Sequence, residues 1–136
     1  MQNPPPVQTP KSSTGLDENI AALLSYVFGW VSGLIFFLIE KDSRLVRFHA
    51  MQSILFNVFI AITGIALWVV VFILLLISTQ LPDILGSLMG LLVTLIWIVF
   101  SIGLLIGWVM CLIKAFQSQY FKLPIIGNLA EKFSTK

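Results

Sequence analysis

The chain has 136 residues, of which 58% are hydrophobic and 10% are charged, and its formal net charge is +2. Its mean hydropathy is +1.00. Because a soluble domain carries about a quarter charged residues, this composition excludes an ordinary water-soluble domain. The small net charge gives no support to a nucleic-acid partner. We therefore expect an integral membrane protein whose main partner is the lipid bilayer.

Residues 1–13 are rich in Pro, Gln and Ser, and we expect a disordered tail there. Three long runs without Asp, Glu, Lys or Arg follow: Ile20–Ile39, Ala50–Leu81 and Ile84–Ile113. Each run is long enough to cross a hydrocarbon core of about 30 Å as a helix. The sequence thus predicts an all-α integral membrane fold. Its three transmembrane helices, at about residues 20–39, 50–77 and 84–113, form one domain over residues 14–117.

Two segments beside the predicted spans are also expected to be ordered. Asp42 and Ser43 are both suitable caps for a juxtamembrane helix that continues into the second span. Residues 118–136 mix apolar side chains with lysines and are interrupted by Pro124 and Gly127. This mixture predicts an interfacial C-terminal tail, with apolar side chains among lipid headgroups and lysines in water.

The positions of Lys and Arg predict the orientation. The first loop and the C-terminal segment hold seven of the eight basic residues, namely Lys41, Arg44, Arg47, Lys114, Lys122, Lys132 and Lys136. Three spans place these two regions on one side, which the positive-inside rule assigns to the cytoplasm. We therefore expect a multi-pass protein of the cytoplasmic (inner) membrane whose N-terminus is outside.

Small residues at four-residue spacing predict close helix packing. The pairs are Gly29 with Gly33, Gly86 with Gly90, and Gly103 with Gly107, and Gly64 lies in the second span. Such pairs let helix backbones approach closely. The packing could occur within the chain or between chains, so we expect self-association or another membrane protein as partner.

A polar-to-small stripe follows one face of the second predicted span: His49, Ser53, Asn57, Ala61 and Gly64, with Gln52 beside it. Two interpretations remain open for this stripe. Its polar groups could form hydrogen bonds between helices, each worth about 0.6–2 kcal/mol. Alternatively, they could line a polar cleft open to the cytoplasm, as part of a small-solute or ion pathway formed by an oligomer.

The residue types give no support to catalysis. His49 with two loop carboxylates is a poor metal-ligand set. A pair of Cys111 and His49 lacks a third group to orient the base. We therefore expect no enzyme activity, no catalytic residue, no metal site and no cofactor.

The run Val46-Arg47-Phe48-His49-Ala50-x-Gln52-Ser53 carries a family resemblance, together with Thr14–Asn19, Glu40-Lys41 and Pro124–Gly127. These segments resemble the Tic-twenty-like family of small bacterial and archaeal membrane proteins, which is related to a chloroplast inner-envelope import component. The resemblance implies a helical membrane protein and, for the plastid relatives, protein translocation. It marks Arg47, Phe48, His49, Ala50, Gln52 and Ser53 as signature positions. The expected function is thus non-enzymatic scaffolding, assembly or translocation, and the solute pathway is the alternative.

Overall fold

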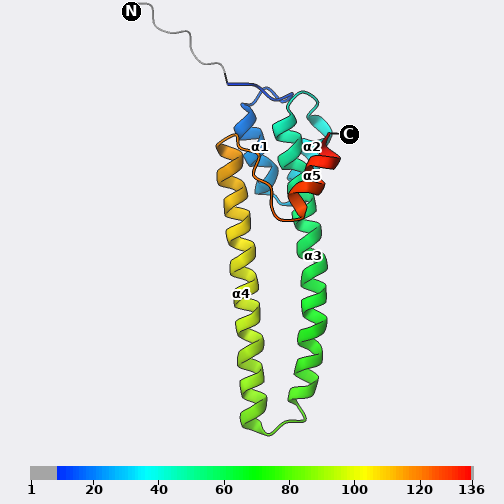
Figure 1. Ribbon diagram of the computed structural model, residues 1–136, viewed down its shortest axis with the longest axis vertical. Helices are drawn as coiled ribbons and strands as arrows, with labels where there is room; N and C mark the ends of the chain where they lie inside the picture. Colours follow the sequence, from blue (N-terminus) through cyan, green and yellow to red (C-terminus); the bar gives the residue numbers. More distant parts are fainter. Residues whose placement is uncertain (1–8, 136) are drawn as a thin grey trace, which may run out of the picture. The chain divides into compact units, whose positions relative to one another are not determined.

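The structure is a computed structural model that describes residues 9–135. It contains five helices in this range (Figure 1): α1 (Glu18–Val27), α2 (Trp30–Ile39), α3 (Arg44–Ser78), α4 (Asp83–Phe116) and α5 (Ile126–Ser134). The predicted all-helical fold is confirmed. The predicted disordered tail falls mostly on residues 1–8, which lie outside the described residues.

The chain divides into two compact units. Unit 1 comprises residues 1–57 and 110–136, and unit 2 comprises residues 58–109. Unit 1 therefore contains α1, α2, the start of α3, the end of α4, and α5. Unit 2 contains the rest of α3 and α4 and the connection between them.

Two helices have the length and composition of membrane spans. α3 has 35 residues and α4 has 34, and only 6% of the most apolar stretch of each is buried inside the protein. At 1.5 Å per residue each helix is about 50 Å long, longer than the hydrocarbon core of about 30 Å. They contain the second and third predicted spans. The expected juxtamembrane helix is the first part of α3, which runs without interruption from Arg44.

The prediction of a first transmembrane helix at residues 20–39 is wrong. This run forms α1 and α2, which have ten residues each and pack against one another. The reversal occurs at Gly29, whose positive φ of 61° suits a residue without Cβ. The Ser32 hydroxyl fixes the turn, because Oγ accepts from the Phe28 N–H at 3.1 Å and donates to the Ser25 carbonyl at 3.0 Å. Each helix is about 15 Å long, half of what a span requires.

The hairpin of α1 and α2 brings the end of α2 back beside the segment that precedes α1. Ser13, which precedes α1, donates to the carboxylate of Glu40, which follows α2, from N–H at 3.0 Å and from Oγ at 2.7 Å. The N-terminal segment and the first loop are therefore neighbours. The expected first span, which would have put them on opposite sides of a membrane, is not found as one helix.

α2 lies close to the start of α3 within unit 1. A Cβ atom added at Gly33 would come within 2.9 Å of the Ala50 carbonyl oxygen and 3.1 Å of Ser53 Cβ. Small residues at these positions let the two backbones approach. The predicted packing role of Gly33 is therefore visible within the chain.

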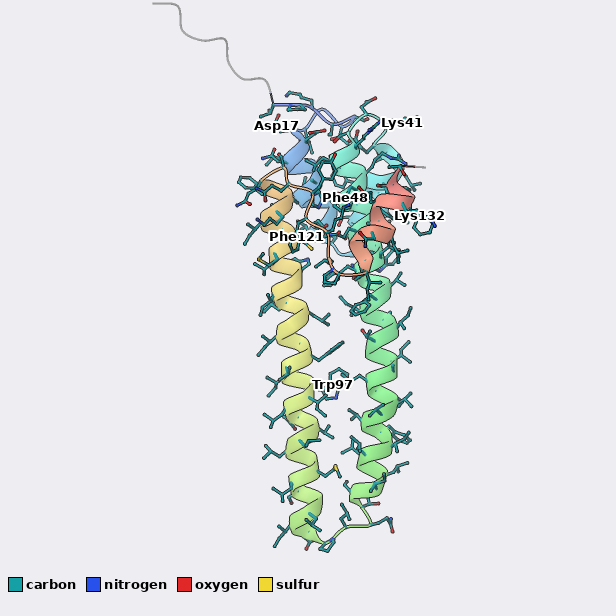
Figure 2. All side chains as sticks on the ribbon, in the orientation of Figure 1. Asp17, Lys41, Phe48, Trp97, Phe121 and Lys132 are labelled. Atoms are coloured by element: carbon teal, nitrogen blue, oxygen red, sulfur yellow. The ribbon has the colours of Figure 1, made fainter. Side chains whose placement is uncertain are left out.

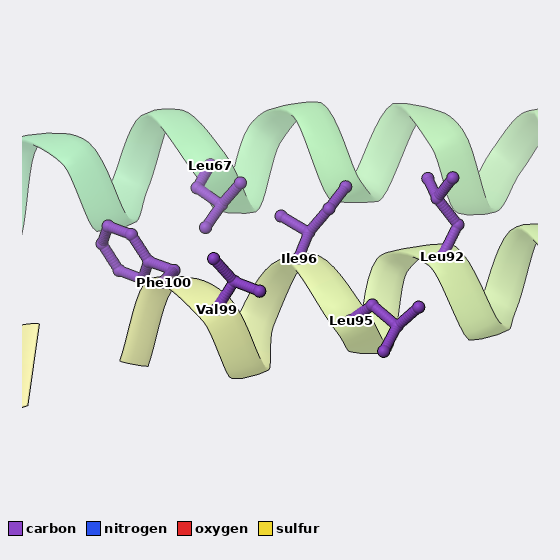
Figure 3. Close-up of a pocket in the computed structure, with 6 residues that line it drawn as sticks. All are labelled: Leu67, Leu92, Leu95, Ile96, Val99 and Phe100. Carbon is purple, nitrogen blue, oxygen red and sulfur yellow. The ribbon is translucent and has the colours of Figure 1, made fainter. Parts of the chain in front are cut away.

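Unit 2 is an apolar helical hairpin whose faces are largely exposed. An open groove of about 530 Å³ lies between its two helices (Figure 3), lined by Leu67, Leu92, Leu95, Ile96, Val99 and Phe100. A Cβ atom added at Gly64, Gly90 or Gly103 would meet no other atom within 4 Å. One added at Gly86 would approach the Ser78 carbonyl at the end of α3, at 3.2 Å. Gly64, Gly90 and Gly103 therefore make no close contact with another helix inside the chain.

Candidate functional site

The side chains of Glu40 and Ser43 accept hydrogen bonds from backbone N–H groups at the start of α3 and in the loop before it. Ser43 Oγ accepts from the Val46 N–H at 3.2 Å. The Glu40 carboxylate, which is fully buried, accepts from the N–H groups of Ser43 at 2.9 Å and of Asp42 at 3.0 Å. Burial favours the neutral acid, but the hydrogen bonds from Ser43, Ser13 and Asp42 outweigh it and hold the pKa of Glu40 below its ordinary value. Glu40 is thus an ionised anchor for the loop.

Arg47 joins the C-terminal ends of two helices. Its Nη1 donates to the Glu40 carbonyl oxygen at 2.8 Å, at the end of α2, and its Nε donates to the Ser134 carbonyl oxygen at 3.1 Å, at the end of α5. The guanidinium carbon also lies 4.6 Å from the centre of the Phe37 ring. A cation at a helix C-terminus pairs with carbonyls that have no partner inside the helix. Arg47 therefore fixes α5 against α2.

His49 is fully buried and hydrogen bonded through both ring nitrogens. Nε2 lies 2.9 Å from the Gln119 carbonyl oxygen, and Nδ1 lies 3.0 Å from the Tyr26 hydroxyl. A carbonyl can only accept, so Nε2 carries the proton. In the neutral ring Nδ1 then accepts from the Tyr26 O–H. His49 thereby connects α1, α3 and the segment after α4.

Gln52 extends this network by one turn of α3. Its Nε2 donates to the Phe121 carbonyl oxygen at 3.0 Å and to the Tyr26 hydroxyl at 3.3 Å, and lies 3.6 Å from Cys111 Sγ. Donation thus runs from Gln52 through Tyr26 to His49 and ends on the Gln119 carbonyl. Within the described residues, the buried Oε1 atom of Gln52 accepts no hydrogen bond.

The other predicted site residues complete the contacts of α3 in unit 1. Ser53 Oγ donates to the Gly29 carbonyl at 3.0 Å, at the turn of the hairpin. Asn57 Nδ2 donates within α3 to the Ser53 carbonyl at 2.9 Å. The Phe48 ring centre lies 5.2 Å from that of His49 and 5.4 Å from that of Tyr120. Figure 2 shows Phe48 and Phe121 in unit 1.

The signature run therefore acts through packing and hydrogen bonds among helices. Between them, Arg47, His49, Gln52 and Ser53 bond α1, the turn after α1, the end of α2, the end of α4, the segment after α4, and α5. Their partners were not predicted from the sequence: these are Tyr26 and the backbone carbonyls of Gly29, Glu40, Gln119, Phe121 and Ser134. Backbone acceptors carry no side-chain signature, and Tyr26 stands out only as a polar residue in an apolar run. Among residues 9–135, no three His, Cys, Asp or Glu residues are grouped as metal ligands would be.

Comparison with known proteins identifies the family. A model of the magnetosome magnetite crystal formation protein family matches residues 16–130. A UPF0132 membrane protein of Methanocaldococcus jannaschii is 40% identical over 124 residues, covering 91% of this chain and 94% of the relative. One of Archaeoglobus fulgidus is 34% identical over 117 residues, covering 86% and 95%. No solved structure matches.

These matches correct the resemblance inferred from the short motifs. The family model and the relatives cover nearly the whole region that was compared with the Tic-twenty-like family, and they place the chain elsewhere. The motif residues are the ones that bond the helices of unit 1. The relatives are membrane proteins, in agreement with the two long apolar helices. This protein is therefore a membrane protein, and it belongs to the magnetosome magnetite crystal formation protein family.

Proposed function

We propose that this protein is a non-enzymatic assembly or scaffolding protein of the cytoplasmic membrane. In this proposal unit 1 lies at the cytoplasmic face, and unit 2 associates with other copies in the bilayer. The observation that carries the proposal is the return of the chain at Gly29, which leaves α3 and α4 as the complete spans.

The orientation follows from the hairpin of α1 and α2. Two spans and one returning hairpin put the N-terminal segment, the first loop and the C-terminal segment on the same side. All the Lys and Arg residues of the described chain then lie on that side: Lys11, Lys41, Arg44, Arg47, Lys114, Lys122 and Lys132. The connection between the spans, residues 79–82, contains none. The positive-inside rule assigns the basic side to the cytoplasm.

Labelling of single cysteines tests this orientation. In a Cys111→Ala background, Gln80→Cys should react with a membrane-impermeant maleimide in intact cells. Lys11→Cys, Lys41→Cys and Lys132→Cys should react only after permeabilisation. External labelling of Lys11→Cys together with an unreactive Gln80→Cys would restore three spans and contradict the proposal.

Self-association is supported by the exposed faces of unit 2. Gly90 and Gly103 have no neighbour within 4 Å of a Cβ position, while the surrounding apolar side chains such as Val99 are exposed. In a bilayer, burial of apolar surface gives no drive for association, so helices associate through close packing at small residues. The polar stripe favours the packing interpretation rather than a solute pathway, because His49, Gln52 and Ser53 are all hydrogen bonded to other segments.

Energy transfer between labelled copies in liposomes tests the assembly. Gly90→Leu combined with Gly103→Leu should lower the transfer by half or more. Val69→Leu, which adds volume at an exposed position of α3 away from these glycines, is the control and should leave the transfer unchanged. Transfer in the unmodified protein no higher than that of an unrelated monomeric membrane protein would disprove self-association.

A further inference from the structure

A polar cavity of about 270 Å³ lies in unit 1, between the start of α3 and the end of α5. It is lined by Lys41, Arg44, Arg47, Ser134 and Thr135. Sites for drug-sized ligands usually measure about 300–1,000 Å³, so this cavity suits a smaller polar group. None of the functions discussed above uses it.

Three cationic side chains line the cavity, and none of its lining residues is an acid. Among residues 9–135, the ion pairs are Lys11–Asp17 and Lys122–Glu131. None of the three cations that line the cavity forms one with a described residue. The nearest acids in sequence are otherwise engaged: Glu40 binds the loop N–H groups and Ser13, and Asp42 Oδ2 accepts from Ser13 Oγ at 2.7 Å. The cavity therefore favours an anion.

The hydroxyl groups of Ser134 and Thr135 on the cavity wall restrict the ligand further. Ser134 Oγ donates to the Glu131 carbonyl at 3.1 Å, and Thr135 Oγ1 donates to the Lys132 carbonyl at 3.2 Å. The two hydroxyl protons are therefore donated to backbone carbonyls of α5, and the oxygen lone pairs can accept a hydrogen bond from a ligand. A phosphate attached to a group with hydroxyl donors therefore fits both the cations and the hydroxyl oxygens that line the cavity.

The depth of the cavity indicates where such a phosphate would come from. α2 is about 15 Å long and joins an exposed apolar turn, where Phe28 is 77% and Trp30 is 55% exposed, to the loop with Lys41. This length equals half of a hydrocarbon core of about 30 Å. The uncharged run of α3 begins at Ala50, so Arg44 lies six residues, about 9 Å, before the start of the hydrocarbon core, at the level of the lipid headgroups.

We propose that this cavity binds the headgroup of an anionic, hydroxyl-bearing phospholipid of the phosphatidylglycerol type. Lys41 and Arg44 contact its phosphate, while Ser134 and Thr135 accept from its hydroxyl groups. The assignment of this phosphate to a lipid rests on the proposed function, which puts unit 1 at the membrane surface. The binding itself does not depend on which face of the membrane unit 1 occupies.

Native mass spectrometry of the full chain in detergent tests the proposal. The protein is titrated separately with phosphatidylglycerol, phosphatidylcholine and inorganic phosphate. We expect one bound phosphatidylglycerol, weaker binding of phosphatidylcholine, and no displacement of the lipid by millimolar phosphate. Lys41→Gln combined with Arg44→Gln should weaken phosphatidylglycerol binding about 30-fold, since each cation near a lipid headgroup contributes roughly fivefold.

The matched control is Lys11→Gln combined with Lys132→Gln, which removes two exposed charges of unit 1 outside the cavity. This control should bind phosphatidylglycerol as the unmodified protein does. Equal weakening in both double variants would show diffuse attraction and overturn the site. Displacement of the lipid by inorganic phosphate would overturn the lipid assignment. Either result leaves the orientation to be judged by the cysteine labelling, which uses no lipid titration.

Discussion

Arg47 and Gln52 show how single side chains hold unit 1 together. Each bonds a backbone carbonyl that lies at least 69 residues away in sequence, Ser134 for Arg47 and Phe121 for Gln52. The Ser134 carbonyl lies at the C-terminus of α5, and the Phe121 carbonyl lies in the segment after α4. Carbonyls at and beyond a helix C-terminus have no donor inside the helix. Replacing one side chain therefore leaves a distant carbonyl without its bond.

Gln52→Met tests the buried network at one residue. The substitution keeps a flexible side chain of similar length and removes the donor for the Phe121 carbonyl and Tyr26. We expect a loss of about 1–3 kcal/mol, the cost of an unsatisfied buried polar group, measured as a lower melting temperature in detergent. Thr94→Val is the control, because the exposed Thr94 hydroxyl bonds only the Gly90 carbonyl of its own helix. Equal melting temperatures for Gln52→Met and the unmodified protein would contradict the role of the network.

Glu40 predicts how stability depends on pH. Its folded-state pKa is lowered, so its ionised form stabilises the fold above the ordinary pKa of 4.5, and this contribution is lost as pH falls through the folded-state value. The melting temperature of the unmodified protein should therefore exceed that of Glu40→Gln at pH 7, and the difference should shrink as pH falls below 4.5 and through the folded-state pKa of Glu40. A difference that does not shrink at any pH below 4.5 would show that ionisation of Glu40 is not the cause.

At the scale of elements, the sequence predicted the long helices and missed the short hairpin. The predicted spans at 50–77 and 84–113 lie inside α3 and α4, and Ser43 caps α3 as expected. Hydropathy of residues 20–39 measures apolar content, which is the same for one 20-residue helix and for two of ten. The reversal depends on Gly29 and Ser32, whose hydrogen bonds become visible only in three dimensions.

The contact of α2 with α3 predicts opposite effects for two glycine substitutions. Gly33→Ala would place Cβ 2.9 Å from the Ala50 carbonyl oxygen, so the helices must separate, and overpacking of this kind costs about 1–3 kcal/mol. Gly64→Ala meets no atom within 4 Å and should stabilise α3 by up to about 1 kcal/mol. Melting temperatures of the two variants, measured side by side in detergent, should move in opposite directions. A shift in the same direction would contradict the close approach of α2 to α3.

At the scale of the whole molecule, the proposed placement predicts the depth of Trp30 in a bilayer. A variant with Trp68→Phe, Trp97→Phe and Trp108→Phe leaves Trp30 as the fluorophore, next to the turn of the hairpin. Lipids brominated near the ends of their acyl chains should quench it more than lipids brominated near the headgroup, since the turn should lie about 15 Å below the headgroups. Stronger quenching by bromine near the headgroup would place the hairpin along the membrane surface.

In the proposed orientation, the return of the chain at Gly29 also sets how much of this protein must cross the membrane during biosynthesis. With two spans and a hairpin that enters and leaves on the basic side, the part to be translocated is the connection between α3 and α4. Residues 79–82 carry no charge, and Asp83 is the first acid beyond them. Insertion can then proceed as one apolar hairpin after synthesis of α4, without export of a hydrophilic domain. Unit 1 is completed later, when α5 emerges and its last carbonyls reach Arg47.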